Sequence, residues 1–278
     1  MKLGATRVLA TCIAALALAR GAVAEPELAA AQIIEKNAEA RGGLEAWRKI
    51  QTLVMQGHVE GGQSPAQFVL TQKRPNKTRF EMVASGHMAV RAFDGTSGWK
   101  MLAGPGSAPS VQPYAREELK FAAEEPIIDG VLIDHAAKGI TVGLEGMDEV
   151  EGHKAYRLHI RLRSGASRHL WVDATSFLEL RYDREAPGTP GQAATVSVFY
   201  RNYKAFDGLQ IPLVIEAGTA TGPRNDRLVI DQVALNPPLD DALFIRPAMP
   251  QHGQPDPNEQ HTNASKLPAH AIPGSLPP

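Results

Sequence analysis

The chain has 278 residues, of which 43% are hydrophobic and 21% are charged, and its formal net charge is −1. These values are typical of a globular protein and exclude collagen-like and coiled-coil chains. The balanced charge argues against a nucleic-acid partner, because phosphate binding depends on a concentrated basic face.

The N-terminal segment has the three parts of a secretory signal peptide. Lys2 and Arg7 form a basic start, residues 8–19 are an apolar run, and Ala22-Val23-Ala24 supplies the small residues for cleavage. We predict cleavage after Ala24, which removes three basic residues and no acidic one, so that the net charge moves from −1 to −4. A membrane anchor is the alternative, but the run is too short to cross a bilayer.

The only cysteine of the chain lies inside this apolar segment. Cys12 follows Leu9-Ala10-Thr11, which distantly resembles a bacterial lipid-attachment sequence, although threonine is a poor residue at that place. Lipid attachment at Cys12 is therefore the weaker alternative to cleavage after Ala24. The predicted mature chain has no cysteine, which excludes disulfides, thiolate nucleophiles and cysteine-ligated metals.

The next elements are a helix and then a series of strands. Apolar residues recur at helical spacing from Leu28 to Ala38, Gly42-Gly43 breaks the run, and Leu44, Trp47 and Ile50 predict another turn or two. After Ile50 the apolar residues alternate with polar ones, and Gly-, Pro- and Asn-containing turns separate the segments. This pattern predicts an antiparallel meander.

One insertion interrupts the strands. Between Arg116 and Ala137 a broken helical stripe is expected, interrupted by Pro126 and Gly130. Strands resume at Ile140 and continue to Leu235, and residues 240–244 predict a last helical turn. Residues 247–278 are rich in proline and lack aromatic residues, which predicts a disordered tail. A single domain over residues 25–246 remains.

The alternation of apolar and polar residues predicts the strand register of the hairpin around Gly165. Pairing Leu162 with Leu170 and Ile160 with Val172 places the apolar residues on one face and brings His159 opposite Asp173. A sheet with one apolar face has to close or to wrap around the helices, so we expect a β-rich α+β fold in which a strongly curved sheet surrounds them.

A search for catalytic patterns yields no strong candidate. Metalloprotease, nucleophile-elbow, nucleotide-binding and calcium-binding patterns are absent from the sequence. Ser97 and Lys100 match the spacing of a serine nucleophile with a lysine base, but the segment reads as a strand instead of a helix start. His159 and His169 share a face among arginines, which disfavour a metal ion. We therefore expect no catalytic residue, no metal site, no cofactor and no enzymatic activity.

Several segments of the chain resemble envelope proteins of the LolA/LolB-like superfamily. The resemblance begins with residues 34–38 and 42–53 and ends its first block at Gly57. It continues in Phe93-Asp94-Gly95, Trp171-Val172-Asp173, residues 207–212 and residues 241–244, in the same order. The similarity extends over residues 33–247.

This resemblance implies an unclosed antiparallel β-barrel with helices as plug and lid, and an apolar cavity that receives acyl chains. It implies a periplasmic, monomeric carrier of lipoprotein or lipid acyl chains, with an inner-membrane donor and an outer-membrane acceptor. An envelope sensing module that recognises a lipid or a partner protein is the alternative, and a hydrolase acting through Ser97 remains a third hypothesis. Our candidate cavity residues, chosen from the apolar alternation and the inserted stripe, are Leu53, Met55, Phe68, Leu70, Phe80, Met82, Met88, Val90, Trp99, Leu119, Ile127, Leu158 and Ile160.

Overall fold

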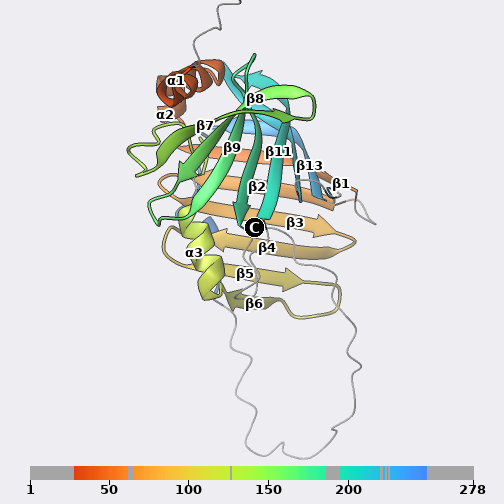
Figure 1. The fold of residues 1–278 in the computed structure, drawn as a ribbon. Coiled ribbons are helices and arrows are strands. Elements are labelled where there is room, and N and C mark those ends of the chain that lie inside the picture. Colours follow the sequence, from red (N-terminus) through yellow and green to blue (C-terminus); the bar gives the residue numbers. More distant parts are fainter. Residues whose placement is uncertain are drawn as a thin grey trace, which may run out of the picture.

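The structure is a computed structural model that describes residues 28–61, 66–125, 127–185, 195–219, 222, 224 and 226–248 (Figure 1). The predicted signal peptide, with its alternatives, lies outside the described residues, as does the predicted tail from residue 249 onward. Among the described residues, no helix is long and apolar enough to cross a membrane.

The predicted N-terminal helices are confirmed. Helix α1 covers Ala30–Ala40 and helix α2 covers Leu44–Arg48. Between them Gly42 and Gly43 have φ values of 106° and 97°, which residues with a Cβ rarely adopt, so the two glycines allow the sharp break. Ile33 of α1 and Trp47 of α2 are fully buried and anchor the helices to the core.

In the part of the chain that the structure describes, thirteen strands form one antiparallel sheet. The first six are β1 (Thr52–Glu60), β2 (Ala66–Lys73), β3 (Lys77–Ala84), β4 (His87–Phe93), β5 (Gly98–Ala103) and β6 (Ser110–Pro113). The other seven are β7 (Thr141–Val150), β8 (His153–Arg161), β9 (Ser167–Asp173), β10 (Glu179–Glu185), β11 (Thr195–Phe206), β12 (Leu209–Gly218) and β13 (Asp226–Leu235). The strand order is β6-β5-β4-β3-β2-β1-β13-β12-β11-β10-β9-β8-β7.

This order determines where the inserted segment lies. Strands β6 and β7 are consecutive in the chain but form opposite edges of the sheet. The first and last strands, β1 and β13, pair with each other in its middle. The connection from β6 to β7 therefore has to cross one face of the sheet. It consists of helix α3 (Arg116–Glu124) and a series of turns over residues 128–139. The predicted helical stripe is thus confirmed only as far as Glu124.

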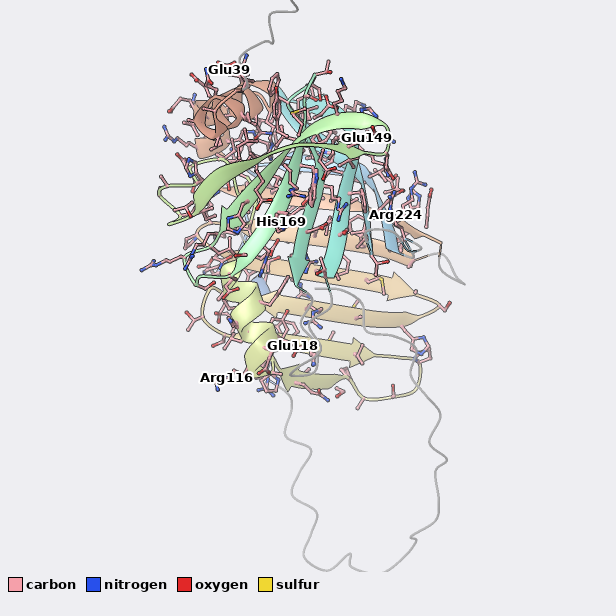
Figure 2. All side chains as sticks on the ribbon, viewed as in Figure 1. Glu39, Arg116, Glu118, Glu149, His169 and Arg224 are labelled. Atoms are coloured by element: carbon pink, nitrogen blue, oxygen red, sulfur yellow. The ribbon has the colours of Figure 1, made fainter. Side chains whose placement is uncertain are left out.

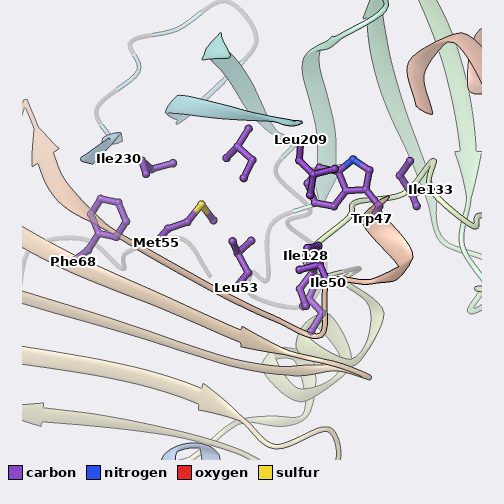
Figure 3. Close-up of a cluster of buried hydrophobic side chains, with 11 residues drawn as sticks. Trp47, Ile50, Leu53, Met55, Phe68, Ile128, Ile133, Leu209 and Ile230 are labelled. Carbon is purple, nitrogen blue, oxygen red and sulfur yellow. The ribbon is translucent and has the colours of Figure 1, made fainter. Parts of the chain in front are cut away.

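The crossing connection covers the face of the sheet that carries Met55, Leu70 and Phe80, which we call the inner face. Residues directly opposite each other in antiparallel strands share a face, and Met55 lies opposite Leu70, which lies opposite Phe80. Two clusters of buried side chains form here, one of them around Trp47, Leu53 and Ile128 (Figure 3). The second cluster packs α1 and the turns against β8, β9 and β10.

The sheet is neither closed nor strongly curled. Strands β1 to β5 run in a different direction from β8 to β11 in Figure 1, as expected when the twist between neighbouring strands accumulates over a wide sheet. The expectation of an unclosed antiparallel sheet is confirmed by the strand order. The expectation of strong curvature is wrong. The helices pack on the inner face of a twisted open sheet, so the sheet does not need to curl around them.

The predicted register of the β8–β9 hairpin is also wrong. Ile160 lies opposite Arg168 and Leu158 opposite Leu170, so that His159 faces His169 instead of Asp173. The turn at Gly165 is where we expected it, because the N–H of Gly165 donates to the carbonyl of Leu162. The offset is even, and the apolar residues therefore remain on the predicted face.

A C-terminal segment covers the opposite face of the sheet, which we call the outer face. The predicted last turn is a 3₁₀ helix, η1 (Asp241–Phe244). The indole N–H of Trp99 donates to the carbonyl of Phe244 at 2.9 Å, and Asp241 pairs with Lys73 and Lys77. Phe244 itself is fully buried.

Candidate ligand cavity

A cavity of about 230 Å³ lies between α3 and the inner face. Its apolar wall comes from β2, β3, β13, α3 and the segment after α3, and its polar wall comes from β2, β3, β4, β10, α3 and the residues just before and after α3. The apolar lining residues are Leu70, Phe80, Phe121, Ala122, Ile127 and Leu228, and the polar ones are Gln72, Thr78, Arg91, Tyr114, Glu118, Glu125 and Arg184. We call this space the inner cavity.

The first turns of α3 are attached to the sheet by one carboxylate. Glu118 accepts hydrogen bonds from Arg91 of β4 at 2.9 Å and from Lys100 of β5 at 3.0 Å. It also accepts one from the backbone N–H of Ala115 at 2.8 Å, which caps the start of the helix. Burial acts to raise the pKa of Glu118, but these three donors outweigh it and the pKa is lowered. Figure 2 shows Glu118 where α3 passes the strands.

The last turn of α3 is attached by a second set of charges, which we call the polar cluster: Arg168, Arg184, Glu124 and Glu125. Arg168 of β9 pairs with Glu124 at 3.7 Å. Arg184 of β10 lies over the ring of Phe121 at 4.7 Å. Burial raises the pKa of Glu125, and the charges of Arg184 and Arg168 oppose that rise only in part.

A second cavity, of about 730 Å³, adjoins the inner cavity, and Glu125 and Ile127 line both. Its walls are the turn at residues 74–76, the end of α3, residues 137–140 and the β8–β9 turn at residues 162–164. We call it the side cavity. At these two residues the side cavity therefore lies next to the space beneath α3.

The connection after α3 is fixed more firmly than α3 itself. Asp129, which is 1% exposed, accepts from Arg74 at 2.5 Å and from Lys138 at 2.6 Å. Arg41 donates to the backbone carbonyl of Asp129 at 2.8 Å. Ile127 and Ile128 are buried in the adjacent core. In contrast, Phe121 is the only buried side chain of α3 among those that the structure describes.

The structure brings some of the predicted cavity residues together. Leu70, Phe80 and Ile127 line the inner cavity. Leu53, Met55 and Phe68 belong to the core beside it, and the ring of Phe68 stacks on that of Phe80 at 5.8 Å. Leu158 and Ile160 belong to the second core cluster. Met82 is half-buried on the inner face, and Leu119 is half-buried on α3 without lining the cavity.

Three predicted cavity residues lie on the outer face. Val90 is opposite Glu81 and Met88 opposite Val83, whereas it is Arg91 that lies opposite Phe80. Trp99 pairs with Ala92 on the same face as Val90. Val90, Ala92 and Trp99 form a separate buried cluster, with Met88 packed against it. These residues lie on the side of the sheet that η1 covers, so they are not candidates for the inner cavity.

The alternative chemical sites do not assemble. Ser97 and Lys100 are three residues apart around the start of an extended strand, and the Lys100 amine donates to both oxygens of Glu118. The rings of His159 and His169 are 5.7 Å apart, and His169 pairs with Glu145 at 3.4 Å. Within the described ranges, no group of three or more His, Cys, Asp or Glu residues is arranged to hold a metal ion.

Sequence reasoning missed the polar side of the cavity. Arg91, Arg184 and Glu118 were not singled out, because a charged residue in a strand or helix usually faces solvent. One signal was present. Glu118, Phe121, Ala122 and Glu125 recur at the spacing of one helical face, which is the face that α3 turns to the cavity.

Comparisons with known proteins identify the fold. No family model and no curated protein matches the sequence. A LolA superfamily protein from Nitrosomonas europaea is 14% identical, with a TM-score of 0.50 over 79% of this chain and 99% of that chain. A DUF1329 family protein from Desulfovibrio piger is 14% identical, with a TM-score of 0.47 over 78% of this chain and 97% of that chain. The chain therefore has a LolA-like fold, and the resemblance found in the sequence is confirmed.

Proposed function

We propose that the protein is a non-catalytic carrier that binds the acyl chain of a lipid or lipoprotein beneath α3. The observation that supports this function best is the inner cavity, which has an apolar wall and is covered by a helix attached through ion pairs. Exposing an acyl chain to water costs about 0.8 kcal/mol per methylene, so a carrier in an aqueous compartment needs such a covered apolar space.

The size of the cavity defines the role of α3. Its volume of about 230 Å³ is below the range of roughly 300–1,000 Å³ that is typical of ligand sites. An acyl chain therefore requires α3 to move away from the sheet. The small apolar contact of α3 suits a helix that moves, because Phe121 is its only buried side chain among those that the structure describes. The side cavity provides the direction of entry.

The proposed setting follows from the sequence. Cleavage after Ala24 releases the protein into the periplasm. There it takes up an acyl chain from an inner-membrane donor and passes it to an outer-membrane acceptor. An envelope sensing module with the same cavity is the alternative. A carrier forms a soluble complex with lipid or lipidated cargo, whereas a sensor forms a complex with a second envelope protein.

Native purification distinguishes these functions. We expect the protein, purified from its own periplasm without detergent, to contain acylated molecules that mass spectrometry of an organic extract identifies. A preparation that is free of lipid and contains a second protein in fixed ratio favours the sensing module. A preparation without either contradicts both proposals.

Substitution of the cavity wall tests the site directly. We expect Phe80→Gln to weaken the binding of a fluorescent acyl probe by about tenfold or more, because it removes an apolar contact worth roughly 1.5–3 kcal/mol. The matched control is Val83→Gln in the same strand, since Val83 is 42% exposed and lies opposite Met88 on the outer face. Equal losses in the two variants would count against the inner cavity as the binding site.

A further inference from the structure

Two arginines lie on the apolar inner face of the sheet. Arg168 is opposite the core residue Ile160, and Arg184 is two residues from the core residue Tyr182 on the same strand. Arg168 is 4% exposed and Arg184 is 7% exposed. A guanidinium group stays charged under all conditions in which a protein is folded. Two buried arginines therefore require anions nearby.

Helix α3 supplies anions at this position. Glu124 pairs with Arg168 at 3.7 Å, and Glu125 lies within the influence of the charges of both arginines. Tyr182 and Tyr200 are the other titratable groups near Glu125, and burial raises the pKa of both phenols, so they remain neutral. Within the polar cluster, the cations thus belong to the sheet, and Glu124, the anion that pairs with Arg168, belongs to the helix that covers it.

Movement of α3 changes this balance. When the helix leaves the sheet to admit an acyl chain, Glu124 and Glu125 leave with it, while Arg168 and Arg184 remain on the strands. The Nε–H of Arg168 is buried and, among the described residues, has no hydrogen-bond acceptor even with α3 in place. Buried charges that lose their partners are strongly unfavourable. The open form is therefore stabilised by a ligand that brings its own negative charge.

We propose that the polar cluster is a head-group site, in which the anionic group of a single-chain amphiphile takes the place of Glu124 and Glu125. The inference rests on the proposed acyl-chain function and adds the ligand class: a long alkyl chain ending in a carboxylate or a phosphate. The alkyl chain occupies the space lined by Leu70 and Phe80, which Arg184 also lines. The anion reaches Arg168 in the place that Glu124 leaves. Neutral and cationic amphiphiles leave Arg168 without the counter-charge that Glu124 supplies when α3 lies on the sheet.

Binding measurements with four amphiphiles of equal chain length test this site. Hexadecanoate, hexadecyl phosphate, hexadecanol and hexadecylamine compete with a neutral fluorescent acyl probe. We expect the two anions to bind at least about tenfold more tightly than the alcohol, as is typical of hydrogen bonds to charged groups, and the amine to bind most weakly. The comparison of the two anions distinguishes a fatty-acid source from a phosphate-bearing lipid.

Two variants separate the anion site from the closure of α3. Arg168→Gln is expected to abolish most of the preference for anions over the alcohol. Glu124→Gln removes the helix partner of Arg168. It is expected to raise the affinity for all four amphiphiles by a similar factor, so that the preference for anions over the alcohol stays unchanged. The control is Lys120→Gln, because the Lys120 side chain is 70% exposed and lies 3.9 Å from Glu124. This variant is expected to leave the preference unchanged.

The outcomes are distinct for the two proposals. Equal affinities for hexadecanoate, hexadecyl phosphate and hexadecanol in the unaltered protein overturn the head-group site and leave the acyl-chain function in place. Because this comparison needs no variant, it decides the matter even if Arg168→Gln does not fold. Absence of binding for all four amphiphiles contradicts the acyl-chain function itself.

Discussion

At the scale of single residues, Glu118 joins α3 to the sheet through hydrogen bonds of its carboxylate. Its carboxylate accepts from Arg91, from Lys100 and from the N–H of Ala115. The donors belong to two strands and to the residue before the helix. Loss of one charge therefore weakens both the start of the helix and its attachment to the sheet.

Glu118→Gln is expected to lower the free energy of unfolding by roughly 1–2 kcal/mol at neutral pH, because hydrogen bonds to a charged group are replaced by weaker ones. The pKa of Glu118 is lowered in the folded protein. Its stabilising contribution is therefore present above the ordinary pKa of glutamate and is lost as the pH falls through the lowered value. The measurement is urea denaturation of both proteins at a series of pH values.

The control for this prediction is Glu117→Gln on the exposed side of the same helix. Below the lowered pKa of Glu118 the carboxyl group is neutral in the unaltered protein as well, so the two stability curves converge. A difference that persists undiminished into acid would show that the charge of Glu118 does not attach α3.

At the scale of elements, the two faces of β3, β4 and β5 are covered by different parts of the chain. Helix α3 lies on the inner face, and η1 lies on the outer face with its 3₁₀ turn over Trp99. Arg79 adds a hydrogen bond to the carbonyl of Leu243 and lies over the Trp99 ring at 5.4 Å. The C-terminal segment therefore stabilises the sheet from the side opposite to the cavity.

We expect Phe244→Ala to lower the free energy of unfolding by about 3 kcal/mol, as is typical of a truncated buried phenylalanine, and to leave the affinity for an acyl probe unchanged. Phe244 is 0% exposed, whereas its neighbour Leu243 is 40% exposed and serves as the control in Leu243→Ala. Chemical denaturation and probe titration of the same preparations provide the two readouts. A large loss of affinity without a loss of stability would contradict the assignment of η1 to the outer face.

At the scale of the whole molecule, the pairing of β1 with β13 joins the two halves of the sheet, which are strands β1 to β6 and strands β7 to β13. The register shifts between Gln56 and Gly57. A Cβ atom at Gly57 would lie 1.9 Å from the carbonyl oxygen of Val229, which is backbone and not a flexible side chain. The close approach of the two strands at this bulge therefore requires glycine.

Gly57→Ala is expected to destabilise the protein by roughly 1–3 kcal/mol or more, since the neighbouring strand has to shift. The matched control is Gly143→Ala in the edge strand β7, where an added Cβ meets nothing within 4 Å. Thermal unfolding followed by circular dichroism measures both. Equal stability of the two variants would mean that the junction accommodates a side chain.

The sequence by itself determined the elements and the chemical character of the protein. Alternation with a period of two located the strands, helical spacing located α1 and the start of α3, and glycines marked the turns at Gly152, Gly165 and Gly208. These features are local, because backbone geometry fixes which neighbouring residues share a face. For the same reason, the predicted β8–β9 register, which was wrong by an even number of residues, still placed each side chain on the correct face of the sheet.

Only the tertiary structure decided which apolar face surrounds the cavity. Met88, Val90 and Trp99 alternate as regularly as Leu70 and Phe80, yet they lie on the outer face. That face is covered by a C-terminal segment in which Phe244 lies 145 residues after Trp99. The polar cluster could not be predicted from the sequence either, because Arg168, Arg184 and Glu124 come from three separate elements. Burial and charge compensation depend on contacts between distant segments, and a local pattern carries no information about them.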